Sequence, residues 1–415
     1  MSPQKQVTIT LNLPDLRILK SELNETGALV ITVESTKLET PCRKCGRLIR
    51  KFHGHDSWIT VRYLPAFGQE TYLRYRPRRY QCLECSEHPT TTERLAWHEP
   101  GSPHTLAYDH HLLLQLVNST IEDVSIKEQI SYDCVLGTLE RLIDTTVDWS
   151  QYVRLDMLGL DEIALKKGHR DFVVIVTARL ASGQVFLLGI LPDRQKKTVA
   201  DFLRSIPDRL KNTLQSACCD MYEGYIEAVR EELPHTDIVI DRFHVAQAYR
   251  AGLDSLRKRE MKRLKSTLSE AEYQQLNGSL WVVRKSPSDL TADQQRVQQL
   301  LFEHSPDLKT AYELQEQLTN IFDEAISQSE AETKIRDWLE QVSASGVKCF
   351  DAFIKTLKRL WNQITNYFIA RQTSAFVEGL NNKLKVLKRR CYGLFNLQHL
   401  FQRIYLDLEG YRLFA

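Results

Sequence analysis

The sequence predicts an α/β domain that is interrupted by an all-α insertion and preceded by a small β-rich domain and a helical segment. Three observations support this fold class. Residues 150–244 alternate strand-like apolar runs with helix-like amphipathic runs, residues 245–370 are polar and helix-compatible throughout, and residues 1–100 combine short alternating strands with two CxxC pairs. Because apolar residues recur every second position in strands and every three to four positions in helices, each change of period marks a domain boundary.

The composition excludes several classes of protein. The chain has 415 residues, of which 42% are hydrophobic and 26% charged, so a disordered or low-complexity chain is excluded. No apolar run approaches the ~18 residues of a membrane helix, and the first residues lack the layout of a signal peptide. We therefore expect a cytoplasmic protein without membrane association. The net charge of +2 does not by itself indicate a polyanionic partner.

The β-rich domain is predicted to span residues 1–100. Two apolar stretches, VTITLNL and LVITVES, lie on either side of the turn-prone NETG, and the runs SWITVRYL and TYLRYRPRRYQC flank the turn PAFGQ. Alternation of apolar and polar residues around such turns is typical of β-hairpins. The second hairpin lies between the two cysteine pairs.

Four cysteines form the pairs Cys42 with Cys45 and Cys82 with Cys85. Four thiolates complete the tetrahedral shell of Zn²⁺ and leave no position for a water, so zinc here would be structural. Unligated or redox-active thiols are the alternative. The other cysteines show no ligand spacing and are expected to be buried small hydrophobic residues: Cys134, Cys218, Cys219, Cys349 and Cys391.

Basic residues surround both cysteine pairs. Such density around a zinc fold favours contact with a phosphate backbone, although an ordinary solvated face is the alternative. The residues that we expect to make these contacts are Arg47, Arg50, Lys51, Arg76, Arg78 and Arg79.

The apolar periodicity within residues 104–147 predicts three short helices, which are LAYDHHLLLQLVN, TIEDVSIKEQI and SYDCVLGTLERLID. Ser131 is a plausible N-cap of the third, because a serine hydroxyl can accept a hydrogen bond from a free backbone N–H of the first turn. Three helices with tight connections indicate a DNA-binding helix-turn-helix. A plain three-helix connector fits the same pattern.

The α/β domain begins in residues 150–244 with three apolar runs that predict a β-meander, followed by helix, strand, helix and strand. This order is that of a ribonuclease-H-like domain. Asp161 lies in the first strand and Asp220 ends the fourth, and in this fold those two strands are neighbours. Their carboxylates would therefore converge and suit Mg²⁺ or Mn²⁺, although an isolated aspartate at a strand end is usually a turn former.

The insertion, residues 245–370, breaks at SPSD and SASG, and residues 371–415 return to strongly periodic helix that completes the α/β domain. One face of this last segment is an apolar stripe, formed by Phe376, Leu380, Leu384 and Leu387. The opposite face is polar and basic. It begins with Glu378 and continues with Asn382, Lys385 and Arg389.

These residues together resemble the bacterial insertion-sequence DDE transposases of the ISL3 type. The matching segments are LGLDEIALKKGH around Asp161, CCDMYEGY around Asp220, DRFHV around Asp241, SAFVEGLNNKLKVLKRRCYGLFN around Glu378, and PCRKCG with RRYQCLEC at the cysteine pairs. The resemblance covers nearly the whole chain. It implies that Asp161, Asp220 and Glu378 form a catalytic, metal-binding acidic triad.

The resemblance also implies an activity. A DNA transposase of this type would bind the terminal inverted repeats of its insertion sequence, hydrolyse the phosphodiester at the element's end with two Mg²⁺ or Mn²⁺ ions, and join the freed 3′-OH to target DNA. Because two ends must meet, we expect a homodimer or larger assembly on double-stranded DNA, associated with the bacterial nucleoid.

Other residues are expected to support this chemistry. Asp241 and His244 form a DxxH pair beside the active site, unless they are only an N-cap aspartate and a packed histidine. Trp281 could stack on a flipped base or lie in the core. A basic stretch in 242–265 and the C-terminal helix would add DNA contacts through Arg257, Lys258, Arg259, Lys262, Arg263, Lys385, Lys388 and Arg389. For the stretch in 242–265, a merely solvated helix is the alternative.

Two other functions fit part of the pattern. A domesticated DNA-binding regulator would keep the cysteine pairs and the helices, but has no use for three acids that repel one another without a metal. A ribonuclease-H-like nuclease would use the same acids to cut DNA without joining it.

Overall fold

The computed structural model describes residues 11, 13–164, 172–371, 375–391 and 396–415. The chain divides into two compact units, residues 1–144 together with 402–415, and residues 145–401. No helix of the described residues combines the length and the apolar character that crossing a membrane requires.

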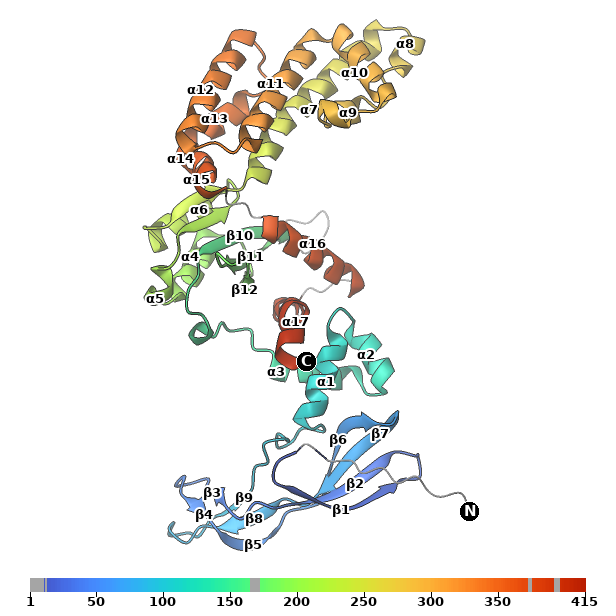
Figure 1. The fold of residues 1–415 in the computed structure, drawn as a ribbon, viewed down its shortest axis with the longest axis vertical. Coiled ribbons are helices and arrows are strands. Elements are labelled where there is room, and N and C mark those ends of the chain that lie inside the picture. The colour runs from blue at the N-terminus through green and yellow to red at the C-terminus, as the bar shows by residue number, and fades with distance from the viewer. Residues whose placement is uncertain (1–10, 12, 165–171, 372–374, 392–395) are drawn as a thin grey trace. The chain divides into compact units, whose positions relative to one another are not determined.

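The first unit begins with a four-stranded sheet in the order β1-β2-β7-β6 (Figure 1). The strands are β1 (Leu16–Leu23), β2 (Leu29–Ser35), β7 (Gln69–Tyr75) and β6 (Ile59–Ala66). Its buried face contributes Ile31, Val33, Val61, Leu73 and Tyr75 to a core cluster that also contains Leu95 and Trp97. The hairpin predicted between the cysteine pairs is confirmed as β6 and β7, which pair antiparallel.

The strand before the NETG turn differs from the prediction. We expected it at VTITLNL, residues 7–13, of which only Leu11 and Leu13 are described, whereas the observed strand is β1 at Leu16–Leu23. Its sequence, LRILKSEL, has no regular alternation because almost every residue of this edge strand is exposed. Charged side chains on an edge strand also discourage pairing with another chain.

Short strands flank the loops that contain the cysteine pairs. β3 (Thr40–Pro41) pairs with β4 (Leu48–Ile49), and a second small sheet has the order β5-β8-β9. The latter strands are β5 (Lys51–His55), β8 (Arg78–Gln81) and β9 (Thr90–Thr92). The buried hydrophobic cluster here is small and includes two of the cysteines: Cys42, Ile49, Tyr80 and Cys82.

The predicted three helices are confirmed as α1 (Leu106–Leu116), α2 (Ile121–Glu128) and α3 (Tyr132–Leu142). Ser131 caps α3 as expected, because its side chain accepts a hydrogen bond from the Cys134 N–H. Asp109, fully buried on α1, accepts hydrogen bonds from Arg141 (2.6 Å) and from Thr138 (3.2 Å) on α3. These contacts join the first helix to the third.

The end of the chain also belongs to this helical part. We placed all of residues 371–415 in the α/β domain, but in α17 (Leu397–Phe414) the segment from residue 402 packs with α1 to α3. Leu406 joins their buried cluster, and Gln402 donates a hydrogen bond to the Ile143 carbonyl (2.8 Å). Asp407 accepts one from the Asn118 N–H (2.9 Å). The amphipathic period predicted the helix but could not show which partner its apolar face contacts.

The second unit contains a five-stranded sheet in the order β12-β11-β10-β13-β14. The strands are β10 (Met157–Ala164), β11 (Phe172–Arg179), β12 (Val185–Leu191), β13 (Ser216–Cys219) and β14 (Asp237–Ile240). β10, β11 and β12 form the predicted antiparallel meander, and β13 and β14 add in parallel beside β10. The expected pairing of the first strand with the strand after the first helices is thus confirmed.

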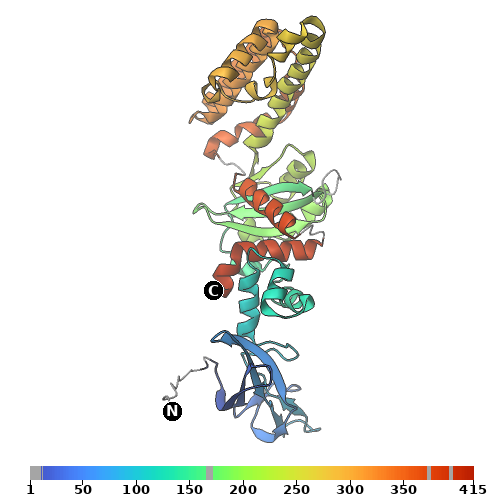
Figure 2. The ribbon, with the colours of Figure 1, turned by 90° about the vertical axis from the view of Figure 1, so that its right-hand side faces the viewer.

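Helices cover both faces of this sheet. α4 (Lys196–Ser205) and α6 (Glu223–Glu232) contact each other on one face, and α16 (Ala375–Arg390) lies on the other face, where it contacts β10 (Figures 1 and 2). The single helix expected at 196–212 is divided into α4 and α5 (Asp208–Lys211). Pro207 explains the division, because a proline disfavours helical geometry at the residue before it.

The insertion is helical, as predicted. It comprises α7 (Arg242–Thr267), α8 (Glu270–Gln274), α9 (Ser279–Val282), α10 (Ala292–His304), α11 (Pro306–Asp323), α12 (Gln328–Ser345), α13 (Asp351–Arg359), α14 (Trp361–Thr365) and α15 (Tyr367–Ala370). The predicted break at SPSD is a short 3₁₀ turn, and SASG ends α12 with Gly346 at a φ of 73°. α7 follows β14 directly, so the insertion begins where this edge strand of the sheet ends.

Candidate active site and zinc site

Three aspartates, which we call the aspartate row, lie at the same level of the sheet. Asp161 belongs to β10, and Asp220 and Asp241 directly follow β13 and β14. The strand register pairs Gly159 with Cys218 and Cys219 with Ile240. Continued by one or two residues, this register sets Asp161 beside Asp220 and Asp220 beside Asp241. Asp161 lies within β10, whereas Asp220 and Asp241 follow the carboxyl ends of β13 and β14.

The aspartate row faces the side of the sheet that α16 covers. The preceding residues, Leu160, Cys219 and Ile240, all belong to the core that contains α4 and α6. Because successive side chains of a strand point to opposite faces, Asp161 and Asp220, which follow Leu160 and Cys219, point away from that core. The sheet thus presents its carboxylates toward α16.

His244 of α7 lies beside this row. Its Nε2 is 3.9 Å from the Asp161 Oδ1, and the Asp161 side chain is 15% exposed. Asp220 accepts a hydrogen bond from the Tyr222 N–H (2.7 Å), and Asp241 accepts one from the Phe243 N–H (2.9 Å). Asp241 is therefore the N-cap of α7, which is one of the two roles that we considered for it. This cap stabilises the first turn of α7, which contains His244.

Negative charge is concentrated at Asp220. Burial raises the pKa of its carboxyl, the Tyr222 N–H and His244 oppose this rise, and the charges of Glu162 and Asp161 add to it. Burial, followed by the charges of Asp220 and Asp241, likewise raises the pKa of the neighbouring Cys219 thiol. A divalent cation would relieve this repulsion, and the oxygen donors of Asp161 and Asp220 suit Mg²⁺ or Mn²⁺.

Residues that the sequence did not single out complete the surroundings. Glu162 points to the opposite face from Asp161 and accepts hydrogen bonds from Arg194 Nη1 at 3.1 and 3.2 Å. The Arg194 guanidinium also lies 4.8 Å from the centre of the Tyr222 ring. Glu162 could have been found from the alternation of LGLDEIAL, whereas Arg194 comes from the loop after β12 and has no local signal.

Glu378 lies in α16, the helix that contacts β10, but its side chain is outside the described residues. Leu384 and Leu387 are buried, which confirms the described part of the apolar stripe, whereas Phe376 and Leu380 are outside the described side chains. Lys385 and Arg389 are exposed, and burial lowers the pKa of the partly buried Lys388.

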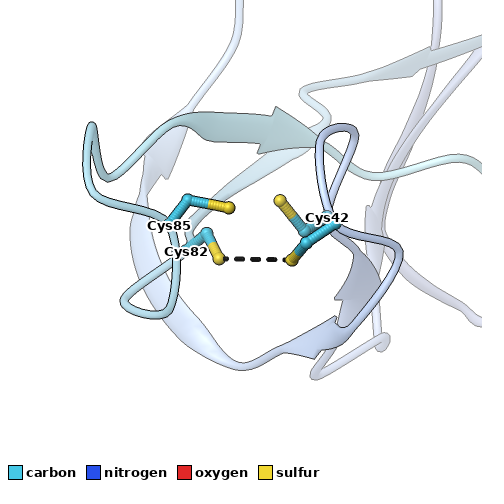
Figure 3. A group of neighbouring side chains, drawn as sticks. Cys42, Cys82 and Cys85 are labelled. Carbon is cyan, nitrogen blue, oxygen red and sulfur yellow. Dashed lines mark hydrogen bonds between the residues drawn. The ribbon is translucent and has the colours of Figure 1, made fainter.

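The four paired cysteines converge as predicted. Their ligand atoms all lie within 4.8 Å of one another, and Figure 3 shows the thiols pointing into a common space between two loops. The Cys45 and Cys82 sulfurs are 3.8 Å apart, about the separation of two ligands in a tetrahedral zinc site with bonds near 2.3 Å. Among the described residues, this is the one group of three or more side chains placed to hold a metal ion.

Backbone groups also face this cluster. Backbone hydrogen bonds from Cys45 and Lys44 lower the pKa of the Cys42 thiol to about 6. Hydrogen bonding with Cys45 raises the pKa of Cys85 to about 12. The Cys42 and Cys85 thiols therefore differ in pKa, and the donor set of four cysteines fits a closed structural zinc site.

The basic residues near the cysteines differ in their surroundings. Lys51 is exposed, Arg47 pairs with Glu84 (2.9 Å), and Arg50 pairs with Glu39 (2.7 Å) at the surface. The others are partly engaged: Arg76 lies over the Trp58 ring (5.6 Å), Arg78 donates to the Lys37 carbonyl (2.9 Å), and Arg79 donates to the Thr90 hydroxyl (2.7 Å).

The basic residues of α7 also fall into two groups. Arg259 and Lys262 are exposed, and Lys258 is exposed although it pairs with Asp254 at 2.9 Å. Arg257 pairs with the same carboxylate, and Arg263 pairs with Glu260 (2.7 Å). Trp281 on α9 is 57% exposed, so the alternative that it lies in the core is wrong.

Comparison with known proteins shows which family the chain resembles. Residues 158–404 match the model of the ISL3 family, described as "Transposase", and residues 39–85 match the "zinc-finger of transposase IS204/IS1001/IS1096/IS1165". The transposase for insertion sequence element IS1001 of Bordetella parapertussis is 27% identical over 92% of both chains. That for IS1557 of Mycobacterium tuberculosis is 23% identical over 89% of this chain and 86% of its own.

A solved structure also resembles the chain. The Drosophila P element transposase strand transfer complex aligns with a TM-score of 0.40 and 11% identity, over 74% of this chain and 92% of that one.

Proposed function

Because this chain belongs to the ISL3 family of transposases, we propose that it cuts and joins DNA at an acidic site made of Asp161, Asp220 and Glu378 on a ribonuclease-H-like sheet. The observation that carries this proposal is the convergence of Asp161 and Asp220 on the sheet face that α16 covers. Glu378 stands in that helix. The strand order β12-β11-β10-β13-β14 supports the fold assignment.

The acids would hold divalent cations, and the neighbouring residues would keep them in place. When Mg²⁺ or Mn²⁺ is bound by such carboxylates, it supplies positive charge that activates a nucleophile and stabilises the leaving oxygen. Asp161 and Asp220 offer oxygen ligands from adjacent strands, and Asp241 caps the helix that sets His244 beside Asp161. In this arrangement His244 positions the Asp161 carboxylate.

The reaction that fits this site has two steps on phosphodiesters. Water first attacks the phosphodiester at the element's end and breaks its P–O3′ bond, which frees a 3′-OH on the element and leaves the phosphate on the flanking DNA. This 3′-OH then attacks a phosphodiester of target DNA in line and displaces the 3′-oxygen of the target strand, which leaves as a 3′-OH. Neither step requires a covalent bond between protein and DNA. Because two ends are joined to one target, the proposal includes a homodimer or larger assembly, with the helix-turn-helix and the zinc ribbon binding the terminal inverted repeats.

DNA affinity would come from the exposed basic residues. Lysines and arginines that neutralise phosphates release counterions and supply most of the sequence-independent affinity. The exposed candidates are Arg47, Arg50, Lys51, Arg76, Lys258, Arg259, Lys262, Arg263, Lys385 and Arg389. Trp281 is exposed and is available for stacking on DNA.

Replacing Glu378 with glutamine tests the third acid. We expect Glu378→Gln to lose cleavage and joining but to bind the element's end as the native protein does, since it removes one ligand charge and no phosphate contact. Glu340→Gln on α12 is the matched control and should keep full activity, because that carboxylate is exposed on the insertion. The measurement is nicking of a duplex carrying the element's end in Mg²⁺, with binding followed by gel shift. Nicking by Glu378→Gln at the native rate would remove Glu378 from the site.

A further inference from the structure

A cavity of about 440 Å³ lies in the insertion, within the roughly 300–1,000 Å³ of small-molecule sites. One wall is a single face of α7, with Phe243, Gln247, Arg250 and Asp254 at steps of three to four residues. The opposite wall contains Val283 and Arg284, which follow α9, and Gln315 of α11, and the lining also includes Ala251 and Leu253. The cavity is therefore lined by segments that lie apart in the sequence.

One end of this cavity lies next to the aspartate row. The Phe243 ring contacts the His244 ring edge-on, with 5.5 Å between their centres, and the His244 Nε2 is 3.9 Å from the Asp161 Oδ1. Phe243 is nevertheless 55% exposed. From Phe243 to Asp254 the helix rises by about 16 Å, so the cavity leads from the acids along α7.

The lining combines a ring surface, hydrogen-bonding groups and positive charge. Asp254 pairs with Arg257 and Lys258 at 2.9 Å and with Arg284 at 3.9 Å. Although burial opposes the effect, hydrogen bonds from Lys258 and Arg257 lower the pKa of the Asp254 carboxyl. The carboxylate stays an acceptor, and Gln247 and Gln315 offer amide donors and acceptors. No carboxylate of the described residues lies within 4 Å of the exposed Arg250 guanidinium.

We propose that this cavity binds an unpaired nucleobase of the DNA strand being cut, stacked on Phe243, with its neighbouring phosphate held by Arg250 and Arg284. This inference rests on the proposed function. Every base has a face that stacks on an aromatic ring, and the amide and carboxylate groups match the polar edge of a base. Trp281, for which stacking on a base was one of two interpretations of the sequence, is not among the lining residues.

The same chemistry would recognise a free nucleotide, so the test must separate the two sources. The probe is a DNA duplex with a short single-stranded overhang that contains the fluorescent base 2-aminopurine, added to the full-length protein without Mg²⁺ or Mn²⁺. Stacking on an aromatic ring quenches this fluorophore, whereas contact through phosphates does not. Adenosine triphosphate is added in separate samples as a competitor.

The native protein and Phe243→Tyr should quench the overhang with similar affinity, since both keep the ring. Phe243→Leu keeps an apolar side chain but loses the ring, and should raise the half-quenching concentration about tenfold. Arg284→Gln should weaken quenching as well, whereas Arg296→Gln, on the exposed surface of α10, should not. Equal quenching by Phe243→Leu and the native protein would overturn the proposal. So would displacement of the overhang by micromolar adenosine triphosphate, which would make this a free-nucleotide site.

Cleavage in Mn²⁺ by the same proteins separates this inference from the function on which it rests. Absence of cleavage by the native protein, with quenching that depends on Phe243, would contradict the proposed function and leave the base site supported. Cleavage by the native protein without any quenching of the overhang would overturn the base site alone.

Discussion

Replacing Asp220 with asparagine is expected to abolish Mn²⁺-dependent DNA cleavage, whereas Asp241→Asn is expected to lower cleavage but leave it measurable. Asp220 lies beside Asp161 in the register, while Asp241 is one strand further from it, about 5 Å per strand step. Removal of a ligand charge costs several kcal/mol of charge stabilisation, and each 1.36 kcal/mol is tenfold in rate, so we expect a loss of roughly a thousandfold or more.

Asparagine at 241 should be tolerated because of what Asp241 does in the structure. Its side chain caps α7 by accepting a hydrogen bond from the Phe243 N–H, and asparagine is about as good an N-cap as aspartate. The helix start and His244 would therefore keep their positions. The measurement is cleavage rate together with Mn²⁺ affinity for both variants. Complete loss of metal affinity in Asp241→Asn, with Asp220→Asn still active, would reverse the assignment.

Replacing Cys82 with serine is expected to release zinc and unfold the cysteine-bearing part of the first unit while residues 145–401 stay folded. The buried cluster around the cysteines contains only four residues, two of them cysteines, and β3 and β4 have two residues each. A structural zinc contributes apparent binding energies of about 10–16 kcal/mol in small zinc-finger peptides, far more than such a core supplies. Folding here should therefore depend on the metal.

Elemental analysis and limited proteolysis measure this effect. The native protein should contain one zinc per chain and resist cleavage near the cysteine pairs, whereas Cys82→Ser should lack zinc and be cut there. Cys349→Ser is the matched control, because Cys349 is also a free cysteine but lies in the insertion, outside the cluster. Native protein without zinc, with all four thiols titratable, would refute the zinc site.

Local patterns predicted the elements that carry the aspartates. The alternating segment LGLDEIAL contains Asp161, and the apolar run SACCD ends in Asp220. The order of strands and helices then required β13 to pair with β10. The four cysteines were predictable because two CxxC pairs satisfy one metal ion. In both cases a local sequence pattern was enough because the geometry of a sheet or of a metal site fixes how distant segments combine.

Long-range packing explains what the sequence did not show. β1 lacks an alternating pattern because it is an exposed edge strand, and the partner of α17 depends on contacts almost 300 positions away, such as that of Asp407 with Asn118. Arg194 belongs to no motif, and Phe243 lies within DRFHV but was not singled out there. The surroundings of both residues arise only when distant segments fold together.

Strand transfer by the purified protein tests the central claim most directly. A duplex with a pre-cut element end is incubated with supercoiled plasmid in Mn²⁺, and covalent joining of its 3′-OH to the plasmid is followed on a denaturing gel. We predict joined products with the native protein and none with Asp161→Asn, although the variant should still bind the duplex. Cutting of DNA by the native protein without joining, or joining by Asp161→Asn at the native rate, would contradict the account.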